Sequence, residues 1–133
     1  MTGAARIDSP CQAAREAKVR IKRVYEPPAP SDGVRVLVDR LWPRGLTRHD
    51  AQVDLWLKNV APSAELRRWF GHDPARWPGF QARYRAELAG NPAVGELRAL
   101  AGQYKQVTLL FAARDAERNN AAVLQAFCCE AQT

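Results

Sequence analysis

The chain has 133 residues, of which 47% are hydrophobic and 26% charged, a size and composition typical of one globular domain with a buried core. No apolar run approaches the roughly 20 residues that cross a bilayer, and the first residues lack the basic start and apolar stretch of a secretory signal. The sequence therefore predicts a cytoplasmic protein with no membrane partner.

The formal net charge of +6 is concentrated in the middle of the chain. Residues 35–85 contain ten Lys or Arg against five Asp or Glu, which is a local excess of +5. Such a field attracts phosphates, nucleotides or nucleic acid. A solvated, arginine-rich surface is an equally good interpretation. The three cysteines, Cys11, Cys128 and Cys129, have neither disulfide-framework nor metal-ligand spacing, which favours structural thiols.

The first half of the chain predicts a leader and two strands. Residues 1–17 show little periodicity and are expected to be a flexible leader before a single α/β domain at residues 18–130. Residues 18–25 alternate between apolar and charged, as a strand does, and the prolines and Asp-Gly of residues 26–33 then favour a turn. The nearly continuous Val and Leu of residues 34–38 predict a strand that is covered on both faces.

The second half predicts helices around one more strand. Helical spacing of apolar residues predicts helices at residues 50–60, 63–70, 77–90 and 91–100. Residues 107–112 predict another apolar strand that is covered on both faces, and a last helix is expected at about residues 117–129. We therefore predict an α/β fold with a small, mostly parallel sheet of about three to four strands packed by helices.

Charged residues follow both apolar strands, at the sheet edge where open α/β folds usually bind ligands. After the strand at residues 34–38, Arg40 and Arg44 offer guanidinium groups for a phosphate or carboxylate, and Trp42 offers a stacking surface. Asp39 is placed to act as a base or nucleophile or to orient a hydroxyl group. Alternatively, Asp39 pairs with an arginine only to hold the strand end.

A second group follows the strand at residues 107–112. Asp115 is expected to cap the last helix and Asn119 to lie on its first turn, so that both point toward an anion at the helix start. Helix capping alone would also explain Asp115. With Arg114, these residues are predicted to form a second wall of the site, and His72 would lie above it as a group that exchanges protons near neutral pH.

Two further candidates have simple structural alternatives. Asp73 precedes a proline in a break between helices, where a helix cap is a sufficient explanation. Lys58 extends the basic region, and it is also explained as a solvated surface charge. The candidate catalytic residues are Asp39, Asp115 and His72, and the candidate ligand-binding residues are Arg40, Trp42, Arg44, Lys58, Asp73, Arg114 and Asn119.

The sequence identifies no cofactor and predicts no resident metal. The chain has two histidines, and no helical spacing pairs them. Magnesium held by Asp39 and Asp115 is the alternative, if a substrate phosphate completes its ligand shell.

Several segments resemble one known family over residues 19–127. The segments are residues 21–28 (IKRVYEPP), 32–45 (DGVRVLVDRLWPRG), 56–58 (WLK), 61–67 (APSAELR), 69–70 (WF), 72–74 (HDP) and 107–113 (VTLLFAA). They resemble the YeaO-like family, domain of unknown function 488, and the string DRLWPRG is specific to it. The resemblance implies a small cytoplasmic α/β domain and assigns it no activity.

The resemblance also implies which polar positions matter in the family. They fall on Asp39, Arg40, Trp42, Arg44, Lys58, His72, Asp73, Asp115 and Asn119. This chain departs from the family pattern at Arg114, where a lysine is usual, and at Arg118 and Asn120, where histidines flank the Asn. If those histidines transfer protons in relatives, this chain is expected to bind the same ligand with weaker or no turnover.

Three classes of function follow from these observations. The first hypothesis is a domain that binds a small molecule with a phosphate or carboxylate group, such as a nucleotide-like ligand. Asp39 or Asp115 would supply any catalysis. The alternatives are a basic module that binds nucleic acid and an interaction protein without chemistry. The sequence leaves the oligomeric state open.

Overall fold

The structure, a computed structural model, describes residues 18–129, so the predicted leader lies outside the described residues. Within that range no helix is long and apolar enough to cross a membrane. The strands are β1 (Val19–Arg23), β2 (Val34–Leu37), β3 (Leu55–Trp56) and β4 (Val107–Phe111). The helices are α2 (Arg48–Ala51), α3 (Ala64–Phe70), α4 (Trp77–Ala89), α5 (Ala93–Gln103) and α6 (Asn120–Cys129), with 3-10 turns at Pro30–Asp32, Lys58–Val60 and Pro74–Arg76.

The four strands form one sheet in the order β1-β4-β2-β3, and every neighbouring pair is parallel. This confirms the predicted small α/β sheet. Val107 at the start of β4 is level with Val19 on one side and with Val34 on the other. The carboxyl ends of the three longer strands therefore lie at the same edge of the sheet.

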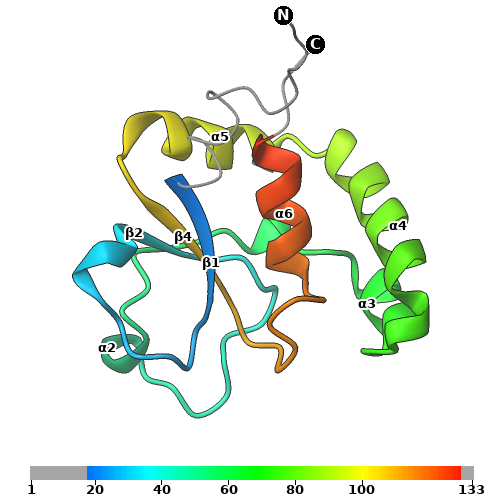
Figure 1. Ribbon diagram of the computed structural model, residues 1–133, viewed down its shortest axis with the longest axis horizontal. Coiled ribbons are helices and arrows are strands. Elements are labelled where there is room, and N and C mark those ends of the chain that lie inside the picture. The colour runs from blue at the N-terminus through cyan, green and yellow to red at the C-terminus, as the bar shows by residue number, and fades with distance from the viewer. Residues whose placement is uncertain (1–17, 130–133) are drawn as a thin grey trace, which may run out of the picture.

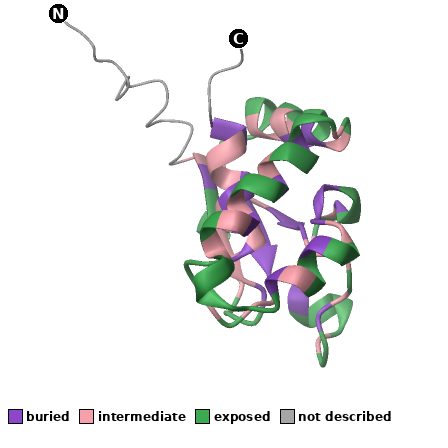
Figure 2. Cartoon of the chain, turned by 90° about the vertical axis from the view of Figure 1, so that its right-hand side faces the viewer, coloured by how far each residue is buried: buried purple, intermediate pink, exposed green. Residues whose placement is uncertain are grey.

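The alternation of strand side chains divides the core into two layers. Val36 and Leu109 face a large apolar cluster that includes residues of α3, α4, α5 and α6, whereas Leu37 and Leu110 face a smaller cluster with Ala51 of α2. Figure 1 shows α4 and α6 to the right of the strands and α2 at the lower left. Buried residues concentrate on the strands and on the inner helix faces (Figure 2). The largely apolar and fully buried sequence of β4 matches its position between the two layers.

The predicted helices at residues 63–70, 77–90 and 91–100 are confirmed. The Ser63 hydroxyl accepts a hydrogen bond from the Leu66 amide at 3.1 Å and caps α3. Gly71, with φ of 54°, ends that helix in the left-handed conformation that glycine adopts at little cost. Burial raises the pKa of the Cys128 thiol on α6 to about 12, as expected for a structural cysteine.

The predicted helix at residues 50–60 is wrong. The chain instead forms the short helix α2, turns at Gln52 with φ of 47°, and continues into the edge strand β3. Arg35 explains the change, because its guanidinium donates to the Ala51 carbonyl at 2.7 Å and to the Gln52 carbonyl at 2.9 Å. Its backbone amide also donates to the Asp54 carboxylate at 2.9 Å. These contacts with β2 outweigh the local helical spacing.

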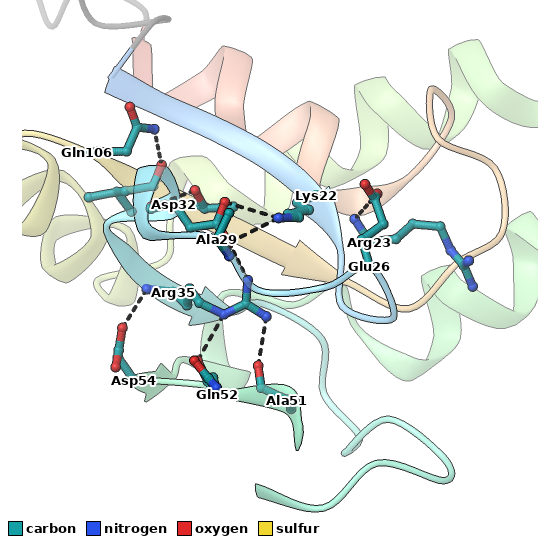
Figure 3. Close-up of polar contacts among 12 residues, drawn as sticks. Lys22, Arg23, Glu26, Ala29, Asp32, Arg35, Ala51, Gln52, Asp54 and Gln106 are labelled. Atoms are coloured by element: carbon teal, nitrogen blue, oxygen red, sulfur yellow. Dashed lines mark hydrogen bonds and ion pairs between the residues drawn. The ribbon is translucent and has the colours of Figure 1, made fainter. Parts of the chain in front are cut away.

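Arg35 belongs to a buried ionic network, which Figure 3 shows beneath the turn that precedes β2. The Asp32 carboxylate accepts a hydrogen bond from Arg35 at 2.6 Å and from Lys22 at 3.1 Å. Asp32 and Arg35 are only 6% and 4% exposed. Burial alone would raise the pKa of Asp32, but its bonds to the Ala29 amide, Lys22 and Arg35 outweigh burial and lower it. The network ties β1, β2 and the segment after α2 together.

Candidate functional site

A cavity of about 540 Å³ opens at the carboxyl edge of the sheet, where the sequence predicts a site. We call it the first cavity. Its lining comes from the segments that follow the three longer strands, from α3 and from the start of α6. The lining residues are Tyr25, Asp39, Arg40, Leu41, Trp42, Pro43, Arg44, Ala61, Pro62, Arg67, His72, Ala112, Ala113 and Asn120.

Asp39 lies in the wall of the first cavity and has a partner on each oxygen. Its Oδ2 accepts a hydrogen bond from the Ala112 amide at 2.9 Å, and its Oδ1 accepts one from Asn120 Nδ2 at 3.0 Å. Burial raises the pKa of Asp39, although these two bonds and the charge of Arg67 oppose the rise. The carboxylate therefore joins the ends of β2 and β4 to the start of α6, and its partners are amides rather than an arginine.

Three arginines line the same cavity, two from the segment after β2 and one from α3. Arg40 donates a long hydrogen bond of 3.5 Å to the Ala61 carbonyl, and its Nε is buried with no partner among the described residues. Arg44 is exposed, and its carbonyl accepts a hydrogen bond from the Tyr25 hydroxyl at 2.8 Å. Arg67 reaches the cavity from α3. Positive charge thus exceeds negative charge in this cavity, because Asp39 is the one acidic residue among the lining residues.

A second cavity, of about 270 Å³, adjoins the first. The two share Pro62, Arg67, His72, Ala113 and Asn120 in their walls. The second cavity adds two arginines, one amide and an apolar wall, which are contributed by Ala64, Arg68, Phe70, Phe80, Arg118 and Asn119.

The predicted roles of Asp115 and Asn119 need correction, because α6 begins three residues later than the expected start at about residue 117. Asp115 does not cap α6. It accepts hydrogen bonds from the backbone amides of Glu117 and Arg118 at 2.9 and 3.0 Å, and these lower the pKa of its exposed carboxyl to about 2. Asn119 is the capping residue, since its Oδ1 accepts from the Ala122 amide at 2.9 Å.

His72 lies between the two cavities and lines both. Its backbone has φ of 58°, a left-handed conformation that is uncommon for a residue other than glycine. Residues held in such conformations cluster at functional sites. The structure places His72 in the walls of both cavities, and a role for it stays a prediction.

Other predicted residues lie apart from the two cavities. Lys58 is exposed, with its Nζ 4.3 Å from the Trp56 ring centre. Asp73 caps a 3-10 turn by accepting a hydrogen bond from the Ala75 amide at 3.0 Å. Arg114 is exposed and lines neither cavity. The two walls predicted from the sequence are therefore only partly brought together.

Trp42 reaches the first cavity but is held in the smaller core cluster. Its Nε1 donates to the Leu46 carbonyl at 2.7 Å, and its ring meets the Trp56 ring edge-on at 5.5 Å. The Arg48 guanidinium lies 6.0 Å from the centre of the Trp42 ring. These neighbours leave less of the ring for a stacked ligand than the sequence suggested.

The sequence analysis did not identify Arg67 or Asn120 as site residues. Arg67 is exposed on α3 and reads as a solvated charge, and its one signal is its position in the family-like segment at residues 61–67. Asn120 stands out only as a departure from the family pattern. Among residues 18–129, no three His, Cys, Asp or Glu side chains are grouped so that they could hold a metal ion.

Comparison with known proteins explains why the family-like segments occur together. A family model described as "Inactive DUF488-N3 subclade" matches residues 18–133. The chain belongs to the DUF488 family. Uncharacterized protein Rv3073c of Mycobacterium tuberculosis is 50% identical over 110 residues, covering 83% of this chain and 92% of that protein. Uncharacterized protein YeaO of Escherichia coli is 42% identical over 106 residues, covering 80% of this chain and 92% of YeaO. No solved structure matches the chain significantly.

The departures from the family pattern that the resemblance implies at positions 118 and 120 concern residues of the two cavities. The resemblance implies histidines there, whereas this chain has Arg118 and Asn120. Asn120 is the residue that bonds Asp39, and Arg118 lines the second cavity. Both departures therefore fall on the two cavities.

Proposed function

We propose that this DUF488 domain binds a phosphate- or carboxylate-bearing small molecule in the first cavity and does not turn it over. The observation that carries the proposal is the approach of Arg40, Arg44 and Arg67 to one cavity whose single carboxylate, Asp39, is already bonded. Guanidinium groups in that arrangement favour a planar or tetrahedral oxyanion, which they bind through paired hydrogen bonds.

One further feature supports an anionic ligand. The helix α6 begins at Asn120, in the wall of the cavity, so the positive end of its dipole lies on the same side as the arginines.

The absence of turnover rests on the groups around Asp39. A general base must direct a free oxygen lone pair at the proton that it accepts, whereas both oxygens of Asp39 already accept hydrogen bonds, one from the Ala112 amide and one from the Asn120 side chain. Asp115, the other candidate, has its carboxylate engaged by the Glu117 amide and by the amide and guanidinium of Arg118. The family description as an inactive subclade supports the same conclusion.

The proposal covers the anionic group of the ligand and not a nucleobase. Cations lie over the rings of Trp42, Trp56 and Trp69, at 6.0, 4.3 and 3.9 Å from the ring centres, so these faces already have partners. Base stacking on free aromatic faces is a main source of affinity for single-stranded nucleic acid. We therefore do not propose the nucleic-acid alternative.

Isothermal titration with inorganic phosphate, sulfate and citrate tests the binding. The charge-neutral variants Arg44→Gln and Arg67→Gln should each weaken binding at least about tenfold, because a hydrogen bond to a charged group contributes about 1.5–3 kcal/mol. Arg20→Gln is the matched control, since Arg20 is an exposed arginine on β1 at the opposite edge of the sheet. Equal losses in all three variants, or no binding of any anion, would contradict the proposal.

The lack of turnover has its own measurement. Phosphorus NMR of a bound phosphate monoester, followed for a day, should show no product above the rate without protein. Product formation that disappears in Asp39→Asn would instead identify an enzyme and overturn this half of the proposal.

A further inference from the structure

We infer that the first and second cavities form one site for a ligand that carries two linked anionic groups, of the diphosphate type. This inference rests on the proposed anion binding and adds the chemical class of the ligand. It is carried by the continuity of the two cavities and by the separation of their arginines.

The two cavities meet along a common wall. Arg67 of α3 and Asn120 of α6 line both, from opposite elements, and His72 lines both from the turn after α3. A ligand group at this junction would therefore contact the same side chains from either cavity. The atoms that link two anionic groups fit at this junction. They need the polar contacts that Asn120 and His72 offer, and Arg67 is the one positive charge that they require.

Each cavity also has arginines that the other lacks. Arg40 and Arg44 line only the first cavity, whereas Arg68 and Arg118 line only the second. With Arg67 these are five guanidinium groups against the one carboxylate of Asp39 in the linings, which is an excess of four positive charges. A single phosphate in the first cavity would leave Arg68, and the donors of Arg118 that Asp115 does not bond, without a ligand.

Arg118 keeps donors for a ligand in spite of its ion pair. Its Nε donates to the Asp115 carboxylate at 3.0 Å, and the ion pair occupies that one nitrogen. The terminal nitrogens of the guanidinium remain available to bind an oxyanion. The buried rings of Phe70 and Phe80 form the apolar wall of the same cavity. An apolar wall lowers the local dielectric and strengthens the attraction between a guanidinium and an anion.

Linking two anions makes the second contact intramolecular, so that affinity rises without a new kind of interaction. Inorganic pyrophosphate should therefore bind at least tenfold more tightly than orthophosphate at equal ionic strength. Pyrophosphate carries more negative charge than orthophosphate, and this charge alone favours its binding to a basic protein. The inference therefore makes the stricter prediction that the preference for pyrophosphate depends on the arginines of the second cavity.

Titration of both anions into four proteins tests the inference. In Arg118→Gln and in Arg68→Gln the preference for pyrophosphate should fall below about threefold, while the affinity for orthophosphate changes less than twofold. The wild type and Arg20→Gln should keep the full preference. Arg68→Gln guards against a folding effect, because Arg118 also bonds the Asp115 turn and Arg68 is exposed on α3.

The outcomes separate the inference from the proposal beneath it. If orthophosphate binds and the preference for pyrophosphate is the same in Arg118→Gln, Arg68→Gln and wild type, the two-group ligand is refuted and the anion site in the first cavity stands. If neither anion binds to the wild type, the proposed function fails and the inference fails with it.

Discussion

Replacing Arg35 by methionine should destabilise the fold more than any other change to a charged residue in the network. The guanidinium is 4% exposed and bonds Asp32 and the carbonyls of Ala51 and Gln52. Removing one member of a buried ion pair costs about 3–5 kcal/mol, and Lys22, still 3.1 Å from Asp32, places this case at the lower end. The buried Ala51 carbonyl adds about 1 kcal/mol and the exposed Gln52 carbonyl little, so we expect about 4 kcal/mol in total.

Urea unfolding followed by tryptophan fluorescence measures this loss. Arg20→Met removes an exposed arginine from β1 and should change the free energy of unfolding by no more than about 0.5 kcal/mol. The double variant Asp32→Asn with Arg35→Met should lose less stability than the sum of the losses in the two single variants, because the two side chains bond each other and that bond is lost only once. A loss below about 1.5 kcal/mol in Arg35→Met, or losses that add in full in the double variant, would refute the reasoning.

Two further predictions concern the same turn. Gly33→Ala should destabilise the protein by about 2 kcal/mol or more, because φ is 65° and the new Cβ would lie 2.1 Å from the Gln106 carbonyl oxygen. Gly95→Ala, at an open position in α5, should instead stabilise the protein by about 0.5–1 kcal/mol. Thermal melts compare the two variants, and equal shifts in melting temperature would contradict the prediction. The pKa of Asp32 is lowered from 3.8 in the folded state, so unfolding takes up a proton in acid, and the stability that Asp32 contributes is complete above about pH 5 and lost as the pH falls through its folded pKa. The difference in unfolding free energy between wild type and Asp32→Asn should therefore shrink from pH 7 to pH 3, and a constant difference would exclude this linkage.

The sheet and the edge at which the first cavity opens were predictable because their signals are local. Residues 34–38 and 107–112 are almost continuously apolar, and charged residues follow each of them directly. A strand covered on both faces needs such a run, and the charge that follows it has to lie at the strand end. The predicted position of the site therefore depended on two short segments, and the structure places a cavity there.

The helix predicted at residues 50–60 failed because the deciding contacts are distant in sequence. The spacing of Val53, Trp56 and Val60 fits a helix, and nothing within the segment contradicts it. Arg35 and its buried bonds to residues 51 and 52 lie on another strand. Helical periodicity is a weak guide where a neighbouring strand captures the backbone carbonyls.

Details of the site depended on helix placement, which the sequence does not specify. Asp115 and Asn119 are both residues that cap helices, so sequence alone cannot choose between them. In the structure Asp115 stabilises a turn and Asn119 caps α6, which moves the helix start and brings Asn120 to Asp39. Arg67 reaches the first cavity only because of how α3 packs beside the sheet.

The strand order has a consequence for how the chain folds during synthesis. β4 lies between β1 and β2, which do not pair with each other, and it is the last strand along the chain, at Val107–Phe111. β4 can join β1 to β2 only after about five-sixths of the 133 residues have been made. Until then β2, which is mostly apolar, and β1, which alternates apolar and charged residues, lack the strand between them and are exposed to association with other chains. A ribosome-bound chain stopped before residue 107 should therefore depend on a chaperone, and the released chain should not.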